Sequence, residues 1–243
     1  MPKLLYADRY NINDKVYVRI PTVGEVLDNE DQYFEIVYSI IATPYDLMVQ
    51  LDDNGIDFTK VTAFDLFCLM FGHLKELDTS LVFGDLDLSK FNLSRNNQNG
   101  NIVLRDEEND ITIDRAIHGQ ICACLRKLLN IPKTEKQPGN EEARRYMLEK
   151  ARKKQKRKKR QKQPDSQIED LVIALVNTAE FPYDYSSVKD ISIYQFYASL
   201  KQVTHKVKFD KTMIGVYAGT VQFDKLGMDE RSWIIMSTTE ENT

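Results

Sequence analysis

The sequence of 243 residues predicts a mainly α-helical protein with a small antiparallel β element, an α+β class. Apolar residues make up 42% of the chain, enough for a packed core, and they recur mostly at helical spacing. The 10 glycines and 7 prolines are too few for a turn-rich β-sandwich. Short runs with β character are confined to residues 15–20 and 80–113.

The first elements have clear beginnings and ends. Residues 15–20 alternate apolar and polar side chains, which predicts a half-buried strand, and Pro21 ends it. Thr22 and Glu25 have the spacing of a capping box, so a helical turn should start there. Helices with mostly apolar inward faces should follow over residues 33–41, 43–54 and 62–77.

The middle of the chain changes to β character. Short β-type runs lie at residues 80–83, 86–93, 101–104 and 110–113. Their tips at residues 96–100 and 107–110 are rich in Asn and Gly or acidic, as hairpins require. A helix should resume near Asp114 and end before Pro132.

The C-terminal part reads as a helical bundle. Apolar residues recur at helical spacing over residues 168–176 and 193–203, and further apolar patches follow at 213–217 and 233–236. We therefore expect an N-terminal α+β unit (1–139), a basic helical or disordered connector (140–164) and a C-terminal helical unit (165–243). Each unit is expected to bury its own apolar helices.

The connector contains the strongest electrostatic signal. Residues 150–162 carry ten Lys and Arg and no acidic residue, in a chain of 33 basic and 37 acidic residues. Three interpretations stay open: a solvated linker that contacts acidic protein surface, contact with nucleic-acid phosphates, or a targeting signal. The run has no aromatic residue for base stacking. Its basic residues are Lys150, Arg152, Lys153, Lys154, Lys156, Arg157, Lys158, Lys159, Arg160 and Lys162.

No catalytic or cofactor-binding pattern emerges, so a non-enzymatic protein without a cofactor is expected. The nucleophile-elbow, phosphate-loop and dinucleotide motifs are absent from the sequence. His118 and Cys122 could share a helix face, but Cys124 points away and further paired ligands for zinc are missing. Asp85, Asp87 and Asp114 stay an open but unspecific candidate set for a divalent metal.

Three cysteines, a polar start and the lack of a long apolar stretch favour a reduced, soluble, intracellular protein. Several segments resemble tail and baseplate assembly proteins of tailed bacteriophages, including tail assembly chaperones. These segments are residues 16–25, 33–35, 54–55, 61–67, 193–200 and 215–219, with Trp233.

The resemblance implies a phage morphogenesis protein that acts through protein–protein contacts and supplies no catalytic residues. Its partners would be tail or baseplate proteins, such as a tape-measure protein. It would act in the host cytoplasm during assembly or stay in the virion. Because tyrosine is enriched at interfaces, we expect Tyr183, Tyr185, Tyr197 and Tyr217 to face a partner. The alternative is a nucleic-acid-binding accessory protein that uses residues 150–162.

Overall fold

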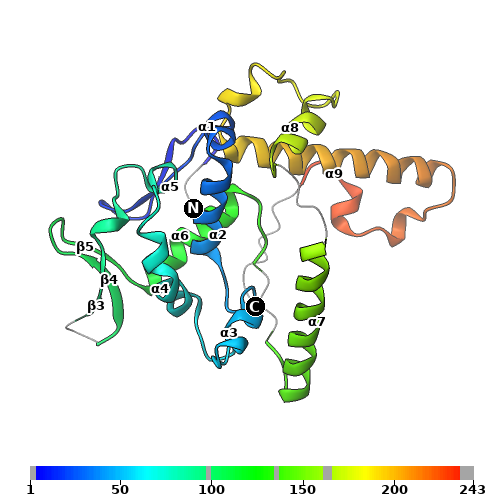
Figure 1. Cartoon of the computed structure of the whole chain (residues 1–243). Helices are drawn as coiled ribbons and strands as arrows, with labels where there is room; N and C mark the ends of the chain where they lie inside the picture. The colour runs from blue at the N-terminus through cyan, green and yellow to red at the C-terminus, as the bar shows by residue number, and fades with distance from the viewer. Residues whose placement is uncertain (1–3, 97–99, 134–136, 161–165, 236–243) are drawn as a thin grey trace.

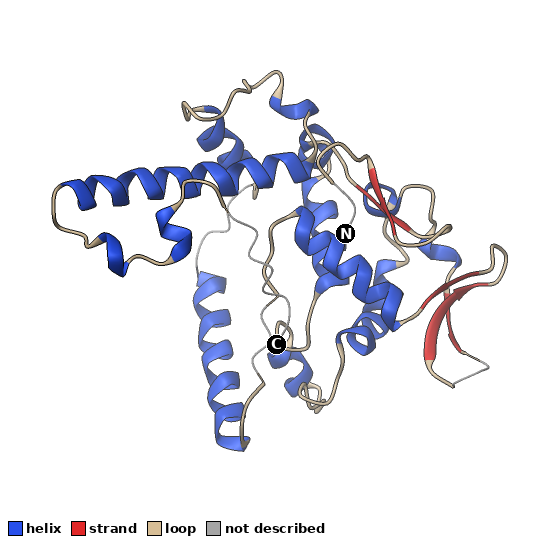
Figure 2. Cartoon of the chain, turned by 180° about the vertical axis from the view of Figure 1, so that it is seen from behind, coloured by secondary structure: helices blue, strands red, loops and turns tan. Residues whose placement is uncertain are grey.

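The computed structural model describes residues 4–96, 100–133, 137–160 and 166–235 and has the expected mainly α architecture with two small antiparallel sheets (Figures 1 and 2). Among the described residues, no helix is long and apolar enough to cross a membrane. The α-helices are α1 (Val23–Asp28), α2 (Glu30–Ile41), α3 (Met48–Asp53), α4 (Ala63–Leu74), α5 (Ser80–Phe83), α6 (Arg115–Leu128), α7 (Glu141–Arg160), α8 (Glu169–Val176) and α9 (Ile193–Tyr217). Short 3-10 helices are η1 (Leu88–Lys90), η2 (Val188–Asp190), η3 (Phe223–Lys225) and η4 (Met228–Arg231).

Both sheets are antiparallel. The first pairs β1 (Arg9–Asn11) with β2 (Tyr17–Arg19), in the register that places Tyr10 opposite Val18. The second has the order β3 (Asn92–Arg95), β4 (Ile102–Asp106), β5 (Ile111–Ile113). The predicted strand at residues 15–20 and the hairpins beyond residue 90 are thereby confirmed.

Side-chain caps fix the starts of the main helices. Thr22 with Glu25 forms the predicted capping box of α1, and Thr62 with Asp65 forms another at α4. Asp114 accepts a hydrogen bond from the Ile117 amide, 2.8 Å away, at the start of α6. Each cap satisfies amide groups that have no partner inside the helix.

The main hydrophobic core surrounds α2. This helix is buried on most of its circumference and contacts α4, α5 and α6. Buried residues of the C-terminal part, among them Ile168, Leu175, Phe196 and Val203, belong to the same cluster. The expectation that the C-terminal helices have an interior of their own is therefore wrong for these residues. They complete the hydrophobic interior begun by residues 4–129, while the predicted unit boundaries stay a prediction.

Three segments differ from the sequence-based expectation. Within the β-type run expected at residues 86–93, Leu88–Lys90 form η1, which Asp87 caps, and β3 begins only at Asn92. Residues 80–83 form α5 rather than a strand, because the segment is too short for alternation to decide and its Val82 and Phe83 are both buried. The apolar patch at 213–217 is not a separate element but the end of α9. The chain has no Gly or Pro between residues 193 and 214 to end that helix earlier.

Candidate interaction surfaces

The basic connector is an ordered helix in its described part. Asn140 caps α7 through its side chain, which accepts a hydrogen bond from the Ala143 amide at 2.8 Å. Glu141 and Glu142 lie in the first turn, where the helix dipole favours negative charge. The residues that follow are strong helix formers, so the helix continues through the basic run to Arg160.

One face of α7 packs against the N-terminal part of the protein. Leu148 is buried in a second, smaller hydrophobic cluster together with Leu51, Phe58 and Leu66. The guanidinium carbon of Arg144 lies 5.6 Å from the centre of the Phe58 ring, within reach of a cation–π interaction. The helix is therefore anchored by an apolar contact and is not a free tether.

Ion pairs reinforce this docking on both sides of Leu148. The Arg152 Nη2 atom lies 2.9 Å from Asp52 Oδ2 and 2.6 Å from Asp53 Oδ1. Arg144 lies 3.8 Å from Asp52 and 3.5 Å from Asp57. We call Asp52, Asp53 and Asp57 the acidic clamp. The bond to Asp53 and its charge raise the pKa of Arg152 above its usual value.

The acidic clamp divides the basic run into residues that pair within the protein and residues that face solvent. Arg152 faces the protein, whereas Lys150, Lys153 and Arg157 lie roughly 140–180° away from Leu148 around the helix, at about 100° per residue. Among the described residues the sole ion pair of this outward face joins Lys153 to Glu149, at 4.0 Å. We define the outward row, all of whose members are exposed, as Lys150, Lys153, Lys154, Arg157 and Arg160.

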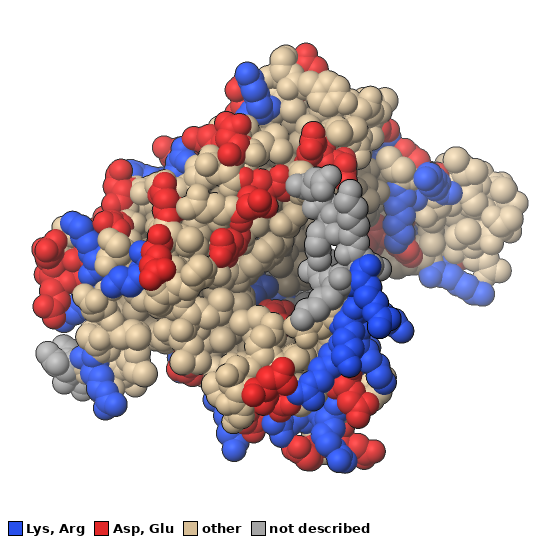
Figure 3. Space-filling view, viewed as in Figure 1, with Lys and Arg blue, Asp and Glu red and all other residues tan. Residues whose placement is uncertain are grey.

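Figure 3 shows the blue basic side chains gathered along the surface of α7. Lys156 is also exposed and lies between the outward row and the docked face. The side chains of Lys158 and Lys159 and the whole of Lys162 lie outside the described residues. The acidic clamp was not predicted from the sequence, because it pairs residues about one hundred positions apart.

The four tyrosines predicted to contact a partner differ in exposure. Tyr217 is 87% exposed, Tyr185 58% and Tyr183 37%. Tyr197 is half-buried and packs against Phe196, with ring centres 5.5 Å apart. Its burial raises the pKa of the Tyr197 hydroxyl to about 12. Tyr183 and Tyr185 lie in the loop between α8 and η2, whereas Tyr197 and Tyr217 lie near opposite ends of α9. Their role in binding stays a prediction.

A second exposed surface follows Val203, the last buried residue of α9 among the described residues. We call residues 204–235 the C-terminal arm; Figure 1 shows it extending from the body as the end of α9 and the returning segment with η3 and η4. A bond from Gln202 Nε2 to the Trp233 carbonyl, at 2.6 Å, ties its end back to α9. Its large exposed apolar residues are Ile214, Tyr217, Phe223, Met228, Trp233 and Ile234.

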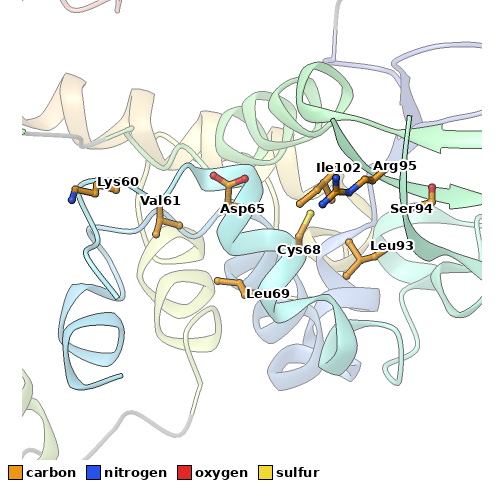
Figure 4. Close-up of a pocket in the computed structure, with 9 residues that line it drawn as sticks. All are labelled: Lys60, Val61, Asp65, Cys68, Leu69, Leu93, Ser94, Arg95 and Ile102. Atoms are coloured by element: carbon orange, nitrogen blue, oxygen red, sulfur yellow. The ribbon is translucent and has the colours of Figure 1, made fainter. Parts of the chain in front are cut away.

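An apolar groove lies on the opposite part of the molecule, between α4 and the sheet of β3 and β4 (Figure 4). It encloses about 740 Å³, and its exposed apolar residues include Leu69, Leu93 and Ile102. Lys60, Asp65 and Arg95 are its charged members. Asp65 forms the capping box of α4 with Thr62. Partial burial would raise the pKa of Asp65, but its hydrogen bonds to Thr62 outweigh this effect and lower the pKa.

The acidic candidates for a metal have structural roles. Asp87 caps η1 by accepting a hydrogen bond from the Ser89 amide at 2.9 Å, and this bonding lowers the Asp87 pKa. Asp114 caps α6, and Asp85 lies beside the Tyr17 hydroxyl. Across the part of the chain that the structure describes, no group of three or more His, Cys, Asp or Glu side chains is placed to hold a metal ion.

His118 lies inside the core rather than at a site. It stacks on Phe67, with ring centres 4.4 Å apart, and its Nε2 atom is 3.1 Å from the Ile40 carbonyl oxygen. The Cys122 thiol lies 3.3 Å from the same nitrogen. Burial lowers the pKa of His118 to about 4 and raises that of Cys122 to about 12, so both are neutral near pH 7.

Comparison with known proteins gives one match. Residues 156–237 match the family model described as the YomV second domain, which is about one third of the chain. The matched range includes the end of α7, all of α8 and α9, and the described part of the C-terminal arm. No curated protein and no solved structure matches the chain.

Proposed function

We propose that this protein is a non-enzymatic phage morphogenesis protein that assists or forms part of tail or baseplate assembly through protein–protein contacts. The observation that carries the proposal is the C-terminal arm, which holds large apolar side chains in water. Tyr217 and Met228 are more than four-fifths exposed, and Trp233 is half exposed. Clusters of large exposed apolar residues are typical of surfaces that bind another protein.

The arm is also built to present these residues at a fixed place. Ile193, Phe196 and Val203 anchor the first half of α9 in the core, and the same helix continues into the arm. Within the arm, Lys208 pairs with Glu230 at 2.9 Å and holds η4 against the helix. A partner would therefore meet a preorganised surface, which lowers the entropy lost on binding.

The phage context is supported by sequence. The segments that resemble phage tail and baseplate assembly proteins include the first residues of α9, at 193–200, and residues 215–219 in the arm. The match of residues 156–237 to the YomV second domain is compatible with a phage protein. A chaperone-like mechanism would use the arm to cover apolar surface on an elongated partner until assembly proceeds.

The proposal is tested by co-expression of the full chain with the tape-measure and baseplate proteins of the same phage genome. We expect the full chain to keep at least one of them soluble and to co-purify with it. A variant with Tyr217→Ser, Met228→Ser and Trp233→Ser should lose this effect at least tenfold, because it removes the exposed apolar surface of the arm.

The matched control carries Tyr6→Ser and Tyr146→Ser, which remove exposed aromatic rings outside the arm. It should retain the partner as the unchanged chain does. If none of these partners is solubilised or co-purified, the assembly function is wrong. If the control loses as much binding as the arm variant, the arm is not the binding surface.

A further inference from the structure

We propose that the outward row of α7 is a docking surface for the phosphate backbone of double-stranded nucleic acid, bound without sequence preference. This inference does not depend on the proposed assembly function, because it concerns a different element and a different class of partner. It rests on how the structure divides the basic run between two faces of one helix.

The first step is the separation of the two faces. Leu148 and the acidic clamp hold one side of α7, and the clamp neutralises Arg144 and Arg152 there. Lys150, Lys153 and Arg157 recur on the other side at spacings of three and four residues, which brings them into one row along the helix. Because the opposite face of α7 packs on the protein, the cations of the outward row all point into solvent on the same side of the helix.

The second step is the isolation of this charge. Lys150, Lys154, Arg157 and Arg160 form no ion pair with any residue that the structure describes. The pair between Lys153 and Glu149 is long and exposed on both sides, so it neutralises little. Like charges at these spacings destabilise a helix. Binding of an anionic partner to the outward row would therefore relieve this repulsion.

The third step is the choice of partner. Protein interfaces bury an apolar centre and are depleted in lysine, yet the outward row contains no apolar side chain that a protein could bury. A regular array of phosphates, with about one charge per 1.7 Å of duplex, needs no apolar contact. Tyr146 is the one aromatic residue of α7 and lies before the row, so base stacking along a single strand is not provided for.

The test measures binding of the full chain to a fluorescent 24-base-pair duplex of arbitrary sequence by anisotropy, between about 50 and 200 mM NaCl. We expect affinity that falls with salt. The variant Lys150→Gln, Lys153→Gln, Arg157→Gln should bind at least tenfold more weakly at 100 mM salt. Its log–log salt slope should shrink by roughly two to three, about one for each phosphate contact removed. Glutamine preserves helix propensity, so α7 should persist.

Two controls separate the row from net charge. Lys189→Gln, Lys201→Gln, Lys211→Gln removes three exposed lysines elsewhere and should bind as the unchanged chain does. The charge-preserving variant Lys150→Arg, Lys153→Arg, Arg157→Lys should also keep its affinity and salt slope. Circular dichroism of each variant verifies that helix content is unchanged.

Three outcomes would overturn the inference. The first is an unchanged affinity and salt slope in the triple glutamine variant. The second is an equal loss of affinity in the lysine control, which would indicate a general charge effect. The third is stronger competition by poly-L-glutamate than by unlabelled duplex at equal total charge, which would indicate an acidic protein partner.

Discussion

The guanidinium of Arg152 lies 2.6 Å from the carboxylate of Asp53 and joins the middle of α7 to the end of α3, ninety-nine residues earlier in the chain. Asp53 is the last residue of α3, where a negative side chain is not favoured by the helix dipole. The contact with Arg152 offsets this unfavourable charge. A helix that is basic over most of its length is thereby held on an otherwise acidic protein.

Removing the clamp charges should loosen α7 with little effect on the rest of the fold. In the variant Asp52→Asn, Asp53→Asn, we expect the free energy of unfolding to fall only slightly, because the pairs with Arg152 are exposed to water. Amide exchange within α7 should rise, and 0.5 M NaCl should reduce the difference from the unchanged chain. Glu107→Gln, Glu108→Gln, in an exposed turn, is the control and should leave α7 exchange unchanged.

Leu148→Ala should release α7 from the second hydrophobic cluster. Removing this buried side chain should cost about 2 kcal/mol of docking free energy, or roughly a 30-fold rise in the open population. Limited trypsin digestion should then cut within residues 150–160 much faster. Tyr146→Ala on the exposed side of the helix should digest at the original rate. Equal rates for the two variants would show that Leu148 does not anchor the helix.

Acid should destabilise the fold through His118. Its pKa of about 4 in the folded state lies below the usual histidine value of about 6.5, so the unfolded chain binds more protons as the pH falls. The stabilisation from the neutral ring is present above pH 6.5 and is lost between pH 6.5 and 4. The group should therefore remove about 2 kcal/mol between pH 7 and 5.

The measurement compares urea unfolding of the unchanged chain with His118→Gln at both pH values. The glutamine amide can donate to the Ile40 carbonyl but does not titrate in this range. The variant should show less loss of stability on acidification, whatever its stability at pH 7. The same pH slope in both proteins would contradict the assignment to His118.

Gly84→Ala should be among the more damaging substitutions of small residues. Gly84 has a φ of 59°, and a Cβ atom there would meet the Tyr17 hydroxyl at 2.2 Å. The Tyr17 hydroxyl accepts a hydrogen bond from the Asp85 amide at 3.0 Å, which a displaced ring would lose. Thermal unfolding should report a loss of about 2–4 kcal/mol, against about 1 kcal/mol for Gly55→Ala, where φ is also positive but the space is open.

Local signals in the sequence were sufficient for most helix starts. Capping pairs such as Thr22 with Glu25 act over three residues and are legible without tertiary structure. The assignment of residues 80–83 failed because four apolar-rich residues are equally compatible with a strand and a buried turn of helix. Burial decided it, since Val82 and Phe83 both pack into the core.

The two faces of α7 and the exposed C-terminal arm could not be predicted from the sequence, because they depend on contacts between residues far apart in the chain. The cationic run was evident, but its division between Arg152 on the docked face and Lys150 on the outward face depends on the position of α3. No local pattern pairs Asp52 with a residue one hundred positions later. The C-terminal arm was likewise hidden, because its apolar residues have the same spacing as those of a buried helix.

The continuity of α9 gives the arm a mechanical property. Twenty-five residues of uninterrupted helix span about 38 Å, and the first three turns pack in the hydrophobic core. Torque applied at Tyr217 is thus transmitted to Phe196 along a stiff rod instead of being dissipated in a hinge. A partner bound near Tyr217 is therefore held at a fixed distance and orientation from the hydrophobic core.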